Sequence, residues 1–128
     1  AARYAGNELT ARDGQMDELQ EPGHWANGPW RGFKFSVYEG GLRVPLIASW
    51  PGRIEPGSTC DSLVGLCDLM ATLADLSGGE IPEGAGEDSV SFAPLFEDPQ
   101  ATSRERLIMQ SVGPSVIRDQ HWKVCVCP

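Results

Sequence analysis

Glycine and proline interrupt this 128-residue chain so often that only short helices and strands fit between them. Fifteen glycines and ten prolines together make up nearly a fifth of the sequence. Proline removes a backbone donor and glycine weakens helix and strand interiors, so this content disfavours a helical bundle. Hydrophobic residues form 41% of the chain, which is enough for a packed core. We therefore expect one loop-rich α/β or α+β domain, or a piece of one.

The charge of the chain is acidic but unevenly distributed. The formal net charge is −8, which disfavours DNA, RNA or anionic membranes as partners. No segment approaches the roughly 18 consecutive apolar residues of a membrane helix. Residues 22–54 contain four basic residues and one acid, a net of +3, so the rest of the chain carries −11. This cationic stretch fits a pocket for a small anion, and the alternative is that it balances acids elsewhere in the fold.

Apolar patterns predict the regular elements. The run 44–50, stopped by Pro51-Gly52, is typical of a strand buried on both faces in a parallel sheet. Asp68 and Asp75 fall on the polar face of a helix predicted over about 66–77, ended by Gly78-Gly79. The apolar face of that helix is defined by residues at helical spacing: Leu66, Leu69, Met70, Leu73 and Leu76.

The last third of the chain is predicted to hold short strands, at 107–109, 116–118 and 122–126. Asp119-Gln120 would turn the last two into a hairpin without the preferred glycine. Ser91 is expected to cap a short turn through residues 92–96.

The cysteines do not form a recognisable metal motif. Neither histidine, His24 or His121, is suitably spaced from them for a zinc site. The prediction is buried free thiols, with a disulfide as the alternative in an exported protein, for Cys60, Cys67, Cys125 and Cys127.

Lys34 is the sharpest candidate for chemistry. It follows Arg31 in a glycine-rich loop directly before the predicted buried strand. In α/β sheets the sites lie in loops at strand ends, and an ammonium group there can reach an oxyanion or a leaving-group oxygen. His24 lies in the same cationic stretch and is a second candidate for ligand contact.

The segments NGPWRGFK (27–34) and YEGGLRVP (38–45) closely resemble the late active-site signature of the sulfatase family, in the alkaline phosphatase superfamily. The resemblance continues in order to about residue 124. It implies the C-terminal part of a sulfatase-like α/β sandwich, with a small C-terminal antiparallel sheet plus helix. Residues 1–100 would then end the catalytic α/β domain, and 101–128 would begin the antiparallel-sheet subdomain.

The resemblance also implies residue roles in a sulfuric ester hydrolase. Lys34 matches the lysine that contacts the sulfate group, while Arg31 and His24 are expected to touch the sugar or aryl part of the substrate. Glu39 and Arg43 are expected to shape the loop and to pair locally.

Family enzymes use calcium and a formylglycine made from the Cys or Ser of a Cys/Ser-x-Pro-x-Arg motif. We expect no such motif in this chain, since no cysteine here has Pro two residues on and Arg four on, and we therefore expect the nucleophile and the metal ligands to lie outside it. The chain alone is therefore expected to be inactive.

Two other functions remain open at this point. One is a phosphoesterase or phosphonate hydrolase of the same superfamily, and the other is a non-catalytic binding module that kept the scaffold. The expected partner is a small sulfated substrate, with no nucleic acid or membrane. The habit of the family suggests a periplasmic, lysosomal or secreted parent protein.

Overall fold

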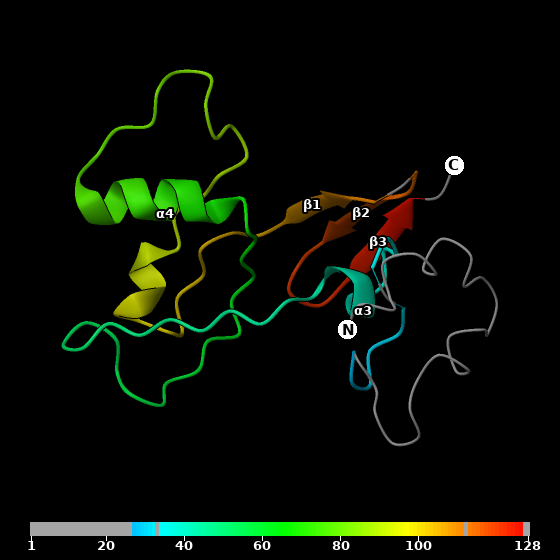
Figure 1. Ribbon diagram of the computed structural model, residues 1–128, viewed down its shortest axis with the longest axis horizontal. Coiled ribbons are helices and arrows are strands. Elements are labelled where there is room, and N and C mark those ends of the chain that lie inside the picture. The colour runs from blue at the N-terminus through cyan, green and yellow to red at the C-terminus, as the bar shows by residue number, and fades with distance from the viewer. Residues whose placement is uncertain (1–26, 33, 112, 127–128) are drawn as a thin grey trace, which may run out of the picture. The chain divides into compact units, whose positions relative to one another are not determined.

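The computed structural model describes residues 27–32, 34–111 and 113–126. Most of these residues lie in loops, as the glycine and proline content predicts. The chain divides into two units that alternate along the sequence: the described residues up to Pro45 with 109–116 and the end of the last strand, and residues 46–108 with 117–124. Figure 1 shows the elements, which are α3 (Glu39–Leu42), α4 (Asp68–Ser77), the 3-10 helix η1 (Ala93–Phe96), β1 (Leu107–Gln110), β2 (Ser115–Arg118) and β3 (Lys123–Val126).

The three strands form one antiparallel sheet in the order β1-β2-β3, which confirms the strands expected near the C-terminal end. The turn between β2 and β3 is closed by a hydrogen bond from the Asp119 N–H to the Trp122 carbonyl, at 2.9 Å. One carboxylate oxygen of Asp119 also accepts the N–H groups of His121 (2.8 Å) and Trp122 (2.6 Å). These bonds organise the predicted hairpin without a glycine, and they lower the pKa of the Asp119 carboxyl.

Helix α4 confirms the predicted helix, but it buries a different face. The residues that it buries are Asp68, Ala71 and Thr72. Exposed fractions of 38–67% belong to residues of the predicted apolar face: Leu66, Leu69, Met70 and Leu73. The expectation for this face is wrong: hydrogen-bonding partners satisfy the buried polar residues, while the leucines of the predicted apolar face are not buried among the described residues.

The buried face of α4 packs against η1 and the residues before it. The Thr72 hydroxyl donates to the Asp68 carbonyl (2.7 Å) and accepts the Phe92 N–H (3.0 Å). Phe92 and Phe96 meet edge to face, with ring centroids 5.8 Å apart. The predicted Ser91 cap is wrong, because the N-cap residue of η1 is Phe92, without a side-chain cap bond; the Ser91 hydroxyl instead accepts the N–H of Ala93 at 3.2 Å.

The predicted buried strand at 44–50 is absent, and this expectation is wrong. The segment forms no strand, and Val44, Leu46 and Ile47 are 55%, 51% and 91% exposed. An apolar run becomes a buried strand only when neighbouring strands pair with it on both sides, and the described residues supply none there. What the structure shows is a small antiparallel sheet plus helices, and the full α/β sandwich is not visible. The boundary between residues 100 and 101 stays a prediction.

Cys60, Cys67 and Cys125 are free thiols, as predicted, but all three are exposed, so their predicted burial is wrong. Cys60 and Cys67 lie in loops, and Cys125 lies on β3, a strand at the edge of the sheet. Cys127 lies outside the described residues. Among the helices described, none combines the length and the apolar content that a bilayer crossing requires.

Candidate functional site

The loop from Asn27 to Arg43, here called the Lys34 loop, is closed by backbone contacts at its base. The Gly40 N–H donates to the Arg31 carbonyl at 2.8 Å, and the Asn27 side-chain amide donates to the Gly32 carbonyl at 2.9 Å. A Cβ atom at Gly40 would fall on the carbonyl oxygen of Gly32. Only glycine permits this approach, so the glycines of the signature set the size of the loop.

Lys34 lies within this closed loop and is exposed. Its ammonium nitrogen is 4.8 Å from the centre of the Phe35 ring, within range of a cation–π interaction. The hydrogen bonds at the base of the loop thus fix the ends of the segment that carries Lys34, while the Lys34 side chain is exposed to solvent. This placement suits a group that must reach an anionic ligand.

Arg31 and Arg43 lie in the same loop, each stacked on an aromatic ring. The guanidinium carbon of Arg31 is 4.0 Å from the centre of the Tyr38 ring, and that of Arg43 is 4.5 Å from the centre of the Trp30 ring. A guanidinium that lies over a ring can still donate its N–H groups to an anion. The cationic stretch found in the sequence therefore becomes three basic side chains on one loop.

The expected pairing of the Glu39 and Arg43 side chains stays a prediction, although the two residues are joined through the backbone. The Arg43 N–H donates to the Glu39 carbonyl at 2.8 Å, which closes α3, whereas the Arg43 guanidinium rests on Trp30. The role predicted for Arg31 in substrate contact stays a prediction. His24, the other predicted contact residue, lies outside the described residues.

Metal ligation finds no support in this part of the protein. Within residues 27–32, 34–111 and 113–126, no group of three His, Cys, Asp or Glu side chains could hold a metal ion. These described residues therefore do not fit the calcium that the family resemblance implies.

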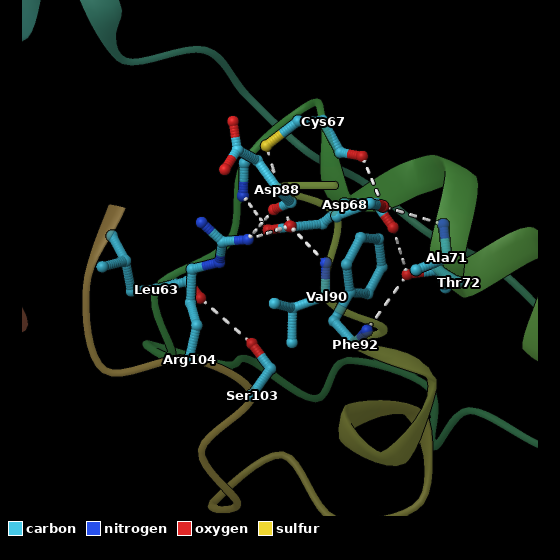
Figure 2. Close-up of polar contacts among 12 residues, drawn as sticks. Leu63, Cys67, Asp68, Ala71, Thr72, Asp88, Val90, Phe92, Ser103 and Arg104 are labelled. Atoms are coloured by element: carbon cyan, nitrogen blue, oxygen red, sulfur yellow. Dashed lines mark hydrogen bonds and ion pairs between the residues drawn. The ribbon is translucent and has the colours of Figure 1, made fainter. Parts of the chain in front are cut away.

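A second polar cluster, which the sequence patterns did not single out, surrounds Asp68 at the start of α4 (Figure 2). Asp68 is fully buried, and its carboxylate forms an ion pair with Arg104, whose side chain is 8% exposed. The same carboxylate accepts the N–H groups of Gly65 (2.7 Å) and Val90 (3.0 Å). Arg104 also donates to the Asp88 carbonyl at 2.7 Å.

This Asp68 cluster joins three segments that are far apart in the sequence: the start of α4, the loop at 88–90 and the segment before β1. Sequence reasoning missed this cluster because the leucine spacing of the helix placed Asp68 on the opposite face, which was expected to be solvated. A lone acid that opens a helix and precedes Leu69 is not by itself a signal of burial. Its arginine partner lies 36 residues further along the chain, beyond the reach of a local pattern.

Cys67 is the thiol nearest to this cluster. Its sulfur lies 3.7 Å from a carboxylate oxygen of Asp68. Partial burial, followed by the negative charge of Asp68, raises the pKa of the Cys67 thiol above its usual value. An elevated pKa leaves little thiolate near neutral pH, so Cys67 is a poor candidate for a nucleophile.

The pentapeptide Ser49-Trp50-Pro51-Gly52-Arg53 matches the serine form of the formylglycine motif letter by letter. The expectation that no Cys/Ser-x-Pro-x-Arg motif occurs in this chain is therefore wrong. In the structure Arg53 is used elsewhere, since its guanidinium pairs with Glu97 at 2.9 Å and lies 5.0 Å from the centre of the Trp50 ring. The Arg53 N–H also donates to the Trp50 carbonyl at 3.0 Å, which closes a turn there, and we expect Ser49 to remain unmodified.

Comparison with known proteins assigns the family. Residues 28–110 match the family model described as N-sulphoglucosamine sulphohydrolase, C-terminal, and they include Lys34 and the whole of the Asp68 cluster. The chain belongs to the sulfatase family. This confirms the resemblance found in the sequence, and it makes the chain a C-terminal sulfatase segment.

Several sulfatases are similar to this chain. An N-acetylgalactosamine-6-O-sulfatase of Bacteroides thetaiotaomicron is 34% identical over 115 residues, which are 87% of this chain and 22% of that protein. Arylsulfatase D of Homo sapiens is 35% identical over 109 residues, or 84% of this chain and 18% of the relative. An ulvan-active sulfatase of Formosa agariphila is 33% identical over 100 residues, which are 70% of this chain and 20% of that protein. The chain thus spans about a fifth of the length of these relatives.

Proposed function

We propose that this chain is part of a sulfuric ester hydrolase and that Lys34 contacts the sulfate group of the substrate. The observation that carries the proposal is the Lys34 loop, closed by the contact between Gly32 and Gly40 inside the region matched to the family. A closed loop presents the ammonium group of Lys34 in a defined place. The substrate class is a small molecule that carries a sulfate ester.

The chemical role of Lys34 follows from its charge. A sulfate ester gains negative charge on the departing oxygen as the S–O bond breaks. An ammonium group beside that oxygen or the sulfate oxygens favours the transition state. Formylglycine and calcium are expected to act from residues outside this chain, and no step is assigned to them. Arg31 and His24 are proposed to contact the remainder of the substrate.

The test is Lys34→Ala in the intact enzyme that carries this segment, assayed with an aryl sulfate. We expect kcat to fall at least tenfold, which is about 1.4 kcal/mol of transition-state stabilisation. Lys123→Ala is the matched control, because Lys123 is the only other lysine of the chain and lies on β3. An unchanged kcat in Lys34→Ala would remove Lys34 from the site.

Two further assays separate the proposal from its alternatives. The purified 128-residue chain is expected to show no turnover with added calcium, and activity of this chain would contradict the assignment of the nucleophile elsewhere. Intact enzyme that hydrolysed a matched phosphate monoester faster than the sulfate would instead be a phosphoesterase. Intact enzyme that hydrolysed neither would support the non-catalytic module.

A further inference from the structure

Phe35, the residue after Lys34, has an unusual backbone conformation. Its φ is +71°, and it is the one non-glycine residue with a positive φ among those that the structure describes. The left-handed region is unfavourable for a bulky side chain, because the Cβ crowds the backbone. Such a conformation persists only where surrounding contacts hold it, and it is concentrated at functional sites. Two things must therefore be identified: the contact that maintains this conformation of Phe35, and the functional benefit that it brings.

The contact that maintains this conformation comes from Ser111, the residue that follows β1. Its hydroxyl donates a hydrogen bond to the carbonyl oxygen of Phe35, 76 residues earlier in the chain. Ser111 is itself fixed, since its N–H donates to the Pro114 carbonyl at 3.0 Å in the connection between β1 and β2. The strained residue is thus tied to a hairpin of the sheet, in the same unit as the Lys34 loop.

The reason lies in the side chain of Phe35. A glycine would adopt the same backbone angle at lower cost, but it would supply no ring. The Phe35 ring faces the ammonium group of Lys34, with the nitrogen 4.8 Å from the ring centre. A cation–π contact of this kind restricts a flexible lysine side chain to fewer directions without removing its charge. The strained backbone of Phe35 thus places its ring where it restricts the direction of the Lys34 side chain.

We propose that Phe35 is a positioning residue for Lys34 and that Ser111 maintains it by holding the Phe35 carbonyl. The inference rests on the proposed contact between Lys34 and the sulfate group. It predicts that losing the aromatic ring reduces turnover only through Lys34. A residue needed merely for folding would reduce turnover and stability whether or not Lys34 is present.

The test is a double-mutant cycle in the intact enzyme, with kcat and KM measured on an aryl sulfate. Phe35→Leu, which keeps bulk but removes the ring, is expected to lower kcat about fivefold, and Phe35→Trp is expected to retain most of it. In the Lys34→Ala background, Phe35→Leu is expected to have no further effect on kcat. Equal loss in both backgrounds, or full activity of Phe35→Leu, would overturn the proposal.

Ser111 is tested with two variants and a control. Ser111→Ala is expected to lower kcat about threefold through loss of one hydrogen bond, and Ser111→Thr, which keeps the hydroxyl, to restore it. Ser58→Ala is the control, because the Ser58 hydroxyl makes a similar bond to the Glu55 carbonyl at 2.7 Å in an exposed loop of the other unit. Equal loss in Ser111→Ala and Ser58→Ala would overturn the role of Ser111.

The two proposals fail in different ways. If Lys34→Ala leaves kcat unchanged, the proposed function falls, and the positioning role falls with it. If Lys34→Ala lowers kcat while Phe35→Leu does not, the proposed function stands and only the positioning role is refuted.

Discussion

Replacing Asp68 with asparagine is expected to destabilise the segment around α4 strongly. The two side chains have nearly the same size, so the substitution leaves no cavity. It removes the charge that balances Arg104, whose side chain is only 8% exposed. It also places an amide group where the carboxylate accepts N–H groups from Gly65 and Val90. Breaking a buried ion pair by removing one partner costs about 3–5 kcal/mol.

That loss is large against the about 5–15 kcal/mol by which a typical domain is stable. The assay is the thermal midpoint of the intact protein, together with amide hydrogen exchange of the peptides that contain Gly65 and Val90. These two amides are expected to lose protection first, because each donates directly to the Asp68 carboxylate. The thermal midpoint therefore gives the size of the destabilisation, and hydrogen exchange shows where in the structure it occurs.

Asp75→Asn is the matched control on the same helix. Asp75 is exposed and makes one side-chain bond, from the Ser91 hydroxyl at 2.7 Å, so its replacement is expected to cost about 1 kcal/mol or less. Adding Arg104→Met to Asp68→Asn is expected to recover part of the lost stability, because no uncompensated charge remains buried. The reasoning is refuted if Asp68→Asn costs no more than Asp75→Asn, or if the double variant is less stable than Asp68→Asn alone.

Three further predictions concern single sites. Gly40→Ala is expected to lower kcat at least tenfold in the intact enzyme, because its methyl group would open the base of the Lys34 loop; full activity would contradict the role of that contact. Alkylation of Cys67 is expected to reach its half-maximal rate at a higher pH in the folded protein than in urea, because burial and Asp68 raise the pKa of the thiol; equal midpoints would contradict this. The tryptic peptide 44–53 is expected to keep the mass of unmodified Ser49, and a mass lower by two hydrogen atoms would reveal formylglycine.

The elements that sequence patterns predicted correctly depend on neighbours along the chain. Helix α4 and the strands β1 to β3 appear close to their predicted residues, since helical and alternating periodicities report interactions within a few positions. The turn at Asp119 likewise forms from bonds to His121 and Trp122. The grouping of Lys34 with Arg31 could likewise be predicted from the sequence, because both residues lie in one short loop.

The incorrect predictions share a different physical cause. Whether the apolar run at 44–50 becomes a strand depends on partner strands, and whether the leucines of α4 are buried depends on what packs against them. Burial of Asp68 depends in the same way on Arg104, which lies far along the chain.

The sequence alone determined the family, the local elements and the loop that presents Lys34, since each depends on residues close together in the chain. Only the tertiary structure decided which face of α4 is buried, that Asp68 pairs with Arg104, and that Ser111 holds Phe35 in a left-handed conformation. The physical reason is that burial and long-range hydrogen bonds are properties of the folded chain. A periodic pattern records which residues can share a face, but the partners that cover the face are chosen by the fold.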